Sequence, residues 1–253
     1  MVNKIAVIIA AVALVTATIF GILTTKDLVA TPRDESTIVV GVNTPFPPFE
    51  DRKGEEVVGF DIDVVKLVAR EAGKTLVIKD FQDFYALLPA LVAGKLDMVI
   101  SAVSITPERE EIVSFSQPYF STSQAILAKV GTTIDANNLN GLIVGYQEGT
   151  TSEEWVKANL AVSDSVTFGE LSLGIQYLKL GNVDVILVDK PVADAFASRD
   201  VDIIVIGNIE TGEVYGVAVQ KGDPKGLLPL VNSLMGTDEY EELVNKWFGG
   251  END

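Results

Sequence analysis

The same local pattern occurs twice in this chain: a helical run ends at a glycine, and an aspartate then leads into an apolar stretch. The first copy is Leu91–Asp97 and the second is Leu178–Asp184. Glycine is the usual residue for ending a helix, and short apolar runs are typical of buried strands. Strands that alternate with helices favour a mostly parallel sheet with helices on both faces. The repetition therefore predicts two similar α/β lobes rather than one continuous sheet.

Apolar periodicity assigns most of the chain to strands and helices of ordinary length. Residues 43–49 contain three prolines and are predicted to form a loop, because proline fixes φ and lacks an N–H donor. We expect strands at 37–42, 76–78, 97–101, 124–128, 142–145, 183–188, 201–206 and 214–219, and helices at 60–72, 85–93, 152–160, 172–180, 193–198 and 227–247.

The N-terminal segment differs from the rest of the chain. A basic start at Met1–Lys4 precedes an uncharged apolar run from Ile5 to Leu23, and a polar linker with Pro32 follows. This order is typical of an export signal, and the run is also long enough to span a membrane as a helix. We expect residues 1–36 to be a signal peptide or a retained membrane anchor plus a linker, and the folded part to lie outside the cytoplasm.

Composition excludes several classes of function. The net charge of −17 leaves no basic stripe for nucleic acid, so a nucleic-acid partner is not expected. The chain has no cysteine and no histidine, which excludes disulfides, thiol nucleophiles, Cys/His zinc sites and Ser-His-Asp triads. We expect neither a metal nor a cofactor.

Two fixed charges of opposite sign stand at predicted strand ends. Ser101, Ala102 and Ser104 follow one apolar strand and lead to Arg109, whereas Asp189 ends another. A guanidinium matches a carboxylate with two parallel hydrogen bonds, and small hydroxyl or backbone donors add to it. Ligand sites of α/β proteins lie at such strand ends. A cation and an anion placed there suit a zwitterion such as an α-amino acid.

A set of short motifs, each weak alone, occurs between Thr37 and Gly249 in the order and spacing of one known family. The motifs are Gly59–Asp63, Phe84–Leu91, Ser104–Arg109, Phe115–Tyr119, Gly149–Thr151, Val188–Pro191 and Lys246–Gly249. Together they resemble the polar amino-acid-binding proteins of ABC importers, which are periplasmic-type solute-binding proteins.

The resemblance implies an α/β fold of two Rossmann-like lobes joined by two hinge strands, which close as a clamp on the ligand. The hinge crossings should fall near 121–126 and 214–219. The first lobe is then discontinuous, with residues 37–125 and 215–253, and the second comprises residues 126–214.

The resemblance also implies roles for individual residues. Arg109 would bind the ligand's α-carboxylate, with Ser104 and the backbone near Ala102 as further donors. Thr150 and Thr151 would complete that site from the second lobe, at a predicted helix start where free N–H groups favour an anion.

The remaining roles concern the ammonium group and the side chain of the ligand. Asp189 would accept the α-ammonium, and Phe46 and Phe84 would flank the side chain. Asn43 stands where family members that bind side-chain amides or ammonium groups often carry aspartate, which disfavours lysine and histidine as ligands. Glutamine-like ligands fit best, and arginine stays open because Gln147, Glu148 or Asp61 would reach a guanidinium, although Asp61 is better placed to order the loop beside its helix.

Each of these roles has a purely structural alternative. The alternatives are an ion pair of Arg109 with Glu110 or Asp83, N-capping by Thr151 or Ser152, N-capping by Asp189, and core packing by Phe84.

The sequence favours a monomeric binding protein that delivers a polar L-amino acid to an ABC transporter permease. Two other functions stay open at this point. One is an enzyme that dehydrates prephenate or arogenate, with Glu148 as the general acid, since some relatives on this fold do so. The other is a receptor subunit that reports the ligand to another protein.

Overall fold

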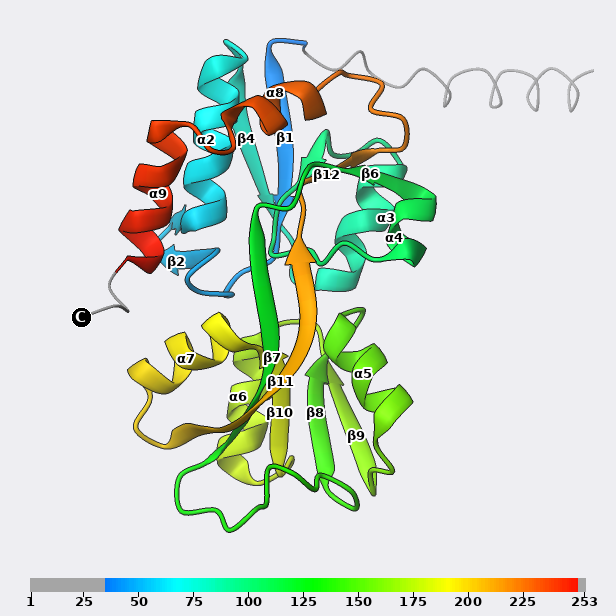
Figure 1. Cartoon of the computed structure of the whole chain (residues 1–253), viewed down its shortest axis with the longest axis vertical. Helices are drawn as coiled ribbons and strands as arrows, with labels where there is room; N and C mark the ends of the chain where they lie inside the picture. Colours follow the sequence, from blue (N-terminus) through cyan, green and yellow to red (C-terminus); the bar gives the residue numbers. More distant parts are fainter. Residues whose placement is uncertain (1–34, 250–253) are drawn as a thin grey trace, which may run out of the picture. The chain divides into compact units, whose positions relative to one another are not determined.

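The structure, a computed structural model, describes residues 35–249. Its first five-stranded sheet belongs to lobe 1 and has the order β4-β1-β5-β12-β6 (Figure 1). The strands are β1 (Thr37–Val42), β4 (Thr75–Asp80), β5 (Met98–Val99), β6 (Val113–Phe115) and β12 (Ala218–Gln220). β1 pairs in parallel with β4 and β5, whereas β12 runs antiparallel to β5 and β6.

Helices cover both faces of this sheet because β1 is apolar on both sides. Ile38, Val40 and Val42 pack with residues of one set of helices, and Val39 packs on the other face with Leu87. The first set is α2 (Phe60–Glu71), α8 (Leu228–Leu234) and α9 (Asp238–Phe248), and the other face holds η1 (Phe84–Ala86) and α3 (Leu87–Val92). Lobe 1 also contains α4 (Pro107–Ile112) and a hairpin of β2 (Asp51–Lys53) and β3 (Glu56–Val58).

The second sheet, in lobe 2, has the order β11-β7-β10-β8-β9. Its strands are β7 (Phe120–Lys129), β8 (Ile143–Gln147), β9 (Asp164–Phe168), β10 (Val185–Asp189) and β11 (Ile203–Tyr215). β8 pairs in parallel with β9 and β10, and β7 runs antiparallel to β10 and β11. The helices of this lobe are α5 (Thr151–Asn159), α6 (Leu171–Leu180) and α7 (Lys190–Arg199).

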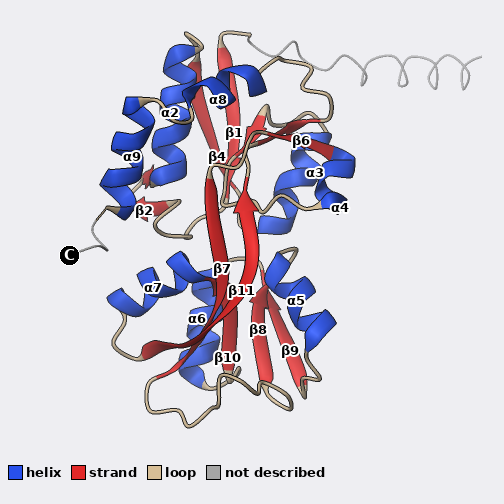
Figure 2. Cartoon of the chain, in the orientation of Figure 1, coloured by secondary structure: helices blue, strands red, loops and turns tan. Residues whose placement is uncertain are grey.

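Two long strands, β7 and β11, pass between the lobes (Figures 1 and 2). Their pairing extends from Ile203↔Lys129 in lobe 2 to Tyr215↔Phe120 at the other end, with two register shifts. At that other end, Tyr215 also bridges to Ser104 of lobe 1. The chain therefore has two α/β lobes joined by two hinge strands, as the sequence predicts.

Some details of the predicted fold are wrong. Each sheet is mixed rather than mostly parallel, because the hinge strand pair in lobe 2, and β12 and β6 in lobe 1, add antiparallel neighbours. The predicted strands 201–206 and 214–219 are a continuous thirteen-residue β11 and a short β12. The predicted helix 227–247 is two helices, since Gly236 has φ 81° and Thr237 caps α9 by accepting from the Tyr240 N–H.

Short elements were not predicted. They are β2, β3, β6, β9 and α4, and the predicted strand 97–101 is reduced to the two residues of β5. Among residues 35–249, none of the helices is both long enough and apolar enough to span a bilayer. The predicted export or anchor segment lies almost wholly in residues 1–34, outside the described part of the chain.

Gly59 allows a close backbone contact at the start of α2. It is the N-cap residue with φ 147°, and a Cβ at this position would lie 2.0 Å from the Phe49 carbonyl oxygen. The Phe49 carbonyl also accepts a hydrogen bond from the Asp61 N–H at 2.9 Å. Only glycine therefore lets the loop after β1 pack directly on the first turn of α2.

Gly59→Ala should lower the free energy of unfolding by roughly 1–3 kcal/mol more than Gly73→Ala. Gly73 lies just beyond the other end of the same helix and has φ 62°. No atom lies within 4 Å of the position that a Cβ would take there, so its substitution costs only the backbone strain. Urea denaturation of both variants measures the difference. Equal losses would show that the Phe49 contact does not constrain position 59.

Candidate functional site

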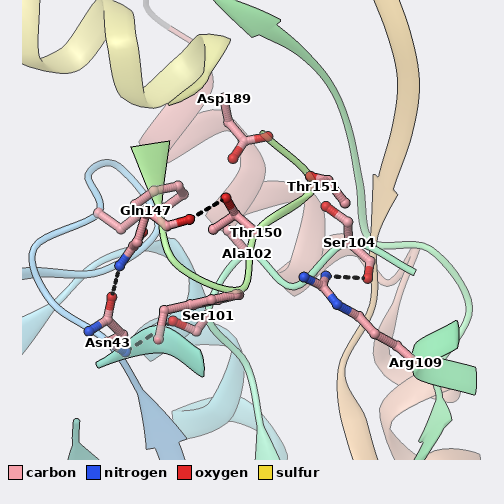
Figure 3. Close-up of a pocket in the computed structure, with 11 residues that line it drawn as sticks. Asn43, Ser101, Ala102, Ser104, Arg109, Gln147, Thr150, Thr151 and Asp189 are labelled. Carbon is pink, nitrogen blue, oxygen red and sulfur yellow. Dashed lines mark hydrogen bonds between the residues drawn. The ribbon is translucent and has the colours of Figure 1, made fainter. Parts of the chain in front are cut away.

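A cavity lies between the two lobes (Figure 3). The structure brings together all eleven residues that the sequence singles out. They are Asn43, Phe46, Phe84, Ser101, Ala102, Ser104, Arg109, Gln147, Thr150, Thr151 and Asp189.

Arg109 is the buried cation of this cavity, and only 9% of it is exposed. The Thr106 cap and Pro107 start α4, which places Arg109 in the first helical turn. Its guanidinium donates to the Ser104 carbonyl at 2.7 Å and to the Gly149 carbonyl of lobe 2 at 2.9 Å. Its Cζ lies 5.8 Å from the centroid of the Phe84 ring. Arg109 therefore contacts both lobes at once.

The alternative surface role of Arg109 does not match the structure. Within residues 35–249, Arg109 forms no ion pair with Glu110, with Asp83 or with any other acidic residue. Burial lowers its pKa, and more distant carboxylates, Glu154 first, partly offset this effect. A guanidinium stays charged in proteins, so this is a buried positive charge without a bound anion from the described chain.

Asp189 is the buried anion of the cavity, at the end of β10. Its Oδ1 accepts from the Gln124 amide at 3.1 Å, and its side chain makes no capping hydrogen bond to α7, so the N-capping alternative does not hold. Burial raises the pKa of Asp189 to about 7, and the charge of Glu213 adds to this effect. The Tyr215 hydroxyl and Arg109 lower it. The positive charge of Arg109 does not fully offset the effect of burial on the pKa of Asp189.

Thr150 and Thr151 have different roles at the start of α5. Thr150 is the N-cap, where its Oγ1 accepts from the Glu153 N–H and donates to the Gln147 carbonyl at 2.7 Å. Thr151 Oγ1 instead donates to Glu213 Oε2 at 2.5 Å. The cap is thus Thr150 rather than Thr151 or Ser152.

Amide groups form the part of the cavity wall around Asn43. Gln147 Nε2 donates to Asn43 Oδ1 at 2.6 Å and to the Gly169 carbonyl at 2.7 Å, so it links the lobes (Figure 3). Asn43 Nδ2 donates to the Phe81 carbonyl. Phe46 is 7% exposed and Phe84 is half-buried, and both line the cavity. This wall is polar, aromatic and uncharged.

The backbone N–H of Ala102 already has a partner within lobe 1. The Ala102 N–H donates to Asp61 Oδ2 at 2.9 Å, so it is not free for a ligand carboxylate. Any backbone donor near Ala102 must come from a neighbouring residue. Asp61 is fully buried and does not line the cavity, which agrees with its predicted role in ordering a loop.

Comparison with known proteins identifies the family of this chain. Residues 38–250 match the family model described as bacterial extracellular solute-binding proteins, family 3. The chain belongs to this family.

Among curated relatives, the L-cystine-binding protein TcyJ of Escherichia coli strain K12 is 30% identical over 87% of this chain and 85% of its own length. The arginine-binding extracellular protein ArtP of Bacillus subtilis strain 168 is 29% identical over 85% and 87%, respectively. A solved structure titled "An ancestral arginine-binding protein bound to arginine" is 38% identical, with a TM-score of 0.78 over 85% of this chain and 99% of that one.

Family membership decides between two of the functions left open by the sequence. Family 3 consists of solute-binding proteins, so this member is a binding protein and not a dehydratase. The family is extracellular, which places the folded part outside the cytoplasm.

Two further residues connect to the site and were not predicted. Glu213 of β11 accepts from Ser104 Oγ at 2.8 Å and from Thr151, and its Oε1 accepts from the Gln124 amide at 3.1 Å. Gln124 of β7 also accepts from Ser152 at 2.6 Å. In the sequence, Glu213 follows Thr211–Gly212 and is indistinguishable from a solvated turn residue. Only the register of β7 with β11 reveals its position.

Asp189→Asn should stabilise the unliganded family member at about pH 8 but not at about pH 4. Folding raises this pKa from 3.8 to about 7, so the folded state binds more protons in that window and stability falls as the pH rises through it. Each pKa unit corresponds to about 1.4 kcal/mol, which gives a gain on the order of 2–4 kcal/mol at the higher pH.

Urea denaturation at both pH values measures this gain, and Asp202→Asn, at an exposed position, is the matched control. A gain that is the same at both pH values would contradict the raised pKa of Asp189.

Proposed function

We propose that this family member captures a polar L-amino acid, glutamine-like or arginine-like, between its two lobes and delivers it to an ABC transporter permease. One observation carries the proposal: a buried cation, Arg109, and a buried anion, Asp189, line one cavity, and neither forms an ion pair within residues 35–249. Isolated buried charges are costly, and a zwitterion supplies the opposite charge to both.

The α-carboxylate of the ligand would bind Arg109, with hydroxyl donors from Ser104 of lobe 1 and Thr151 of lobe 2. Both hydroxyls donate to Glu213, so the carboxylate competes with Glu213 for them. The α-ammonium would bind Asp189. Hydrogen bonds to charged groups contribute about 1.5–3 kcal/mol each, and more of that energy is retained where water is excluded.

The side-chain end of the ligand would meet the amides of Asn43 and Gln147 and the rings of Phe46 and Phe84. Gln147 Oε1 accepts no hydrogen bond within the described chain, so it can accept one from a ligand N–H. A neutral amide wall suits a glutamine-like side chain, and the two rings allow a guanidinium to stack by cation–π contact. Relatives named for arginine and glutamine support the same range.

The lobe boundaries follow from the same proposal. We infer that residues 37–125 and 215–249 move as one body against residues 126–214, with β7 and β11 as the hinge. The protein would act as a monomer and would be tethered to the membrane through residues 5–23 if that segment is retained.

A thermal-shift screen against the twenty L-amino acids should give a concentration-dependent rise in Tm with one or a few polar amino acids, because a ligand that binds only the folded state stabilises it. Arg109→Lys should abolish the shift, since an ammonium cannot replace two guanidinium contacts on separate carbonyls and still bind a carboxylate bidentately. Arg70→Lys is the matched control, since Arg70 is exposed and pairs with Glu239. A shift that survives in Arg109→Lys would contradict the carboxylate site.

Affinity for the amino acid found in the screen should rise with pH up to about pH 7 and level off above it, by up to about tenfold per unit, because the ammonium needs an ionised Asp189. Binding below about pH 7 should release a proton, which isothermal titration calorimetry in two buffers of different ionisation enthalpy measures. In Asp189→Asn the affinity should fall at least about tenfold, or ~1.4 kcal/mol, and lose its pH dependence. A pH profile unchanged by this substitution would show that another group titrates.

A further inference from the structure

A second pair of buried carboxyl groups lies one layer behind the cavity wall. Glu50 ends the loop after β1 and Asp61 is in the first turn of α2, and both are fully buried. Neither lines the cavity, and neither forms an ion pair within residues 35–249. Two adjacent buried negative charges would be strongly unfavourable.

Each carboxyl group uses one oxygen to hold a residue of the cavity wall. Ser101 Oγ donates to Glu50 Oε1 and accepts from the Asn43 N–H at 3.0 Å. Asp61 Oδ2 accepts from the Ala102 N–H at 2.9 Å and from the Tyr119 hydroxyl at 3.0 Å. The neighbours Ser101 and Ala102 are thus each bonded to a different member of the pair.

Within residues 35–249 the other oxygen of each carboxyl group, Glu50 Oε2 and Asp61 Oδ1, is buried without a hydrogen-bond partner. The two residues are neighbours in space, because the Asp61 N–H donates at 2.9 Å to the carbonyl of Phe49, the residue before Glu50. A single proton between these oxygens would satisfy both and remove the charge repulsion.

We propose that Glu50 and Asp61 share one proton at neutral pH and that this carboxyl pair positions Ser101 and Ala102 at the cavity wall. The proton resides on Glu50, because Asp61 accepts two other hydrogen bonds and lies at the N-terminus of a twelve-residue helix, where a negative charge is favoured. Burial, followed by the charge of Asp61, raises the pKa of Glu50 well above its usual range. Burial raises the pKa of Asp61 to about 6, and its hydrogen bonds from Ala102 and Tyr119 lower it.

The neighbouring titratable groups of the described chain supply no positive charge to the Glu50–Asp61 pair. Asp80 faces Glu50 and adds negative charge, although Arg52 pairs with it at the surface. Tyr119 and Tyr240 face Asp61, and burial raises the pKa of both, so they stay neutral.

The positioning role follows from the backbone of Ala102, which has φ 47°. This conformation costs a non-glycine residue free energy and persists only where contacts hold it. The Asp61 bond to its N–H is such a contact, and it also directs that N–H away from the ligand. The effect on ligand binding rests on the proposed function, whereas the shared proton does not.

Two conservative variants and their combination test the shared proton. In Glu50→Gln the amide N–H replaces the carboxyl O–H toward Asp61, and in Asp61→Asn the amide donates to an ionised Glu50. Each single variant should keep its Tm within a few degrees of the parent at about pH 7. The double variant places two NH₂ groups face to face, so its Tm should fall about 5–10 °C below the sum of the single changes.

If both groups were ionised instead, each single variant would raise Tm markedly and the double variant would not be worse, which would overturn the proposal. A direct readout avoids dependence on folding of the double variant. The infrared spectrum at about pH 8 should contain a protonated carboxyl C=O band, measured in the Asp189→Asn background to remove that group. Glu50→Gln should abolish the band, and its absence from the parent would also overturn the shared proton.

The positioning role is tested by exchange of the Ala102 amide hydrogen and by ligand affinity. Asp61→Ala should lose at least about tenfold in amide protection and in affinity for the amino acid identified by the screen, and Asp61→Asn, which keeps an acceptor oxygen for the Ala102 N–H, should restore both to within about threefold. If no amino acid binds the parent, the proposed function fails while the infrared band and the amide protection still report on the pair. If Asp61→Ala leaves the Ala102 amide protected, the pair does not position the wall.

Discussion

The site depends on one constraint: a positive and a negative side chain are removed from water in the same cavity without pairing with each other. Within residues 35–249 the Arg109 guanidinium donates hydrogen bonds to carbonyl oxygens and to no carboxylate, and Asp189 accepts from an uncharged amide. A protein core normally avoids this arrangement, because each charge loses hydration without a counter-charge. Here the fold enforces it, since α4 of lobe 1 and β10 of lobe 2 fix the two groups from opposite sides. In the proposed function, a ligand that carries both opposite charges would pair with both groups.

A residue of the hinge places a further negative charge near Asp189. Glu213 lies on β11, one of the two strands that join the lobes, and it accepts from Ser104 of lobe 1 and Thr151 of lobe 2. It holds these hydroxyls across the cavity, and its charge raises the pKa of Asp189. A ligand ammonium at Asp189 would relieve that repulsion, and a ligand carboxylate would take over the two hydroxyls. The same strand that connects the lobes thus links their relative position to the charge state of the site.

Local sequence signals predicted what depends on local physics. The short apolar run at residues 37–42 predicted β1 with its observed bounds, and strand-end reasoning with the family motifs singled out the residues that line the cavity. The continuous β11 was not predicted, because Gly207 and Gly212 lie within it and its polar middle is held by register with β7 rather than by its own propensity. Glu213 and Glu50 were missed as partners of the cavity wall for the same reason, whereas Asp61 was expected to order a loop. Their contacts join residues far apart in sequence, such as Ser101 with Glu50 and Ser104 with Glu213.

The buried carboxyl groups near the cavity illustrate two different solutions to one energetic problem. All three have pKa values raised mainly by burial, so each makes the folded state less stable as the pH rises. Glu50 and Asp61 are both buried behind the wall, and one shared proton would remove their mutual repulsion and leave a single negative charge, which the Ala102 N–H and the Tyr119 hydroxyl stabilise. Asp189 faces the cavity, and its hydrogen-bond donor in the described chain is the uncharged Gln124 amide, so either a proton from water or a cation from the proposed ligand would remove its cost. In the proposed function the pair behind the wall would contribute a fixed scaffold, and the single carboxylate in front of it would make binding sensitive to pH.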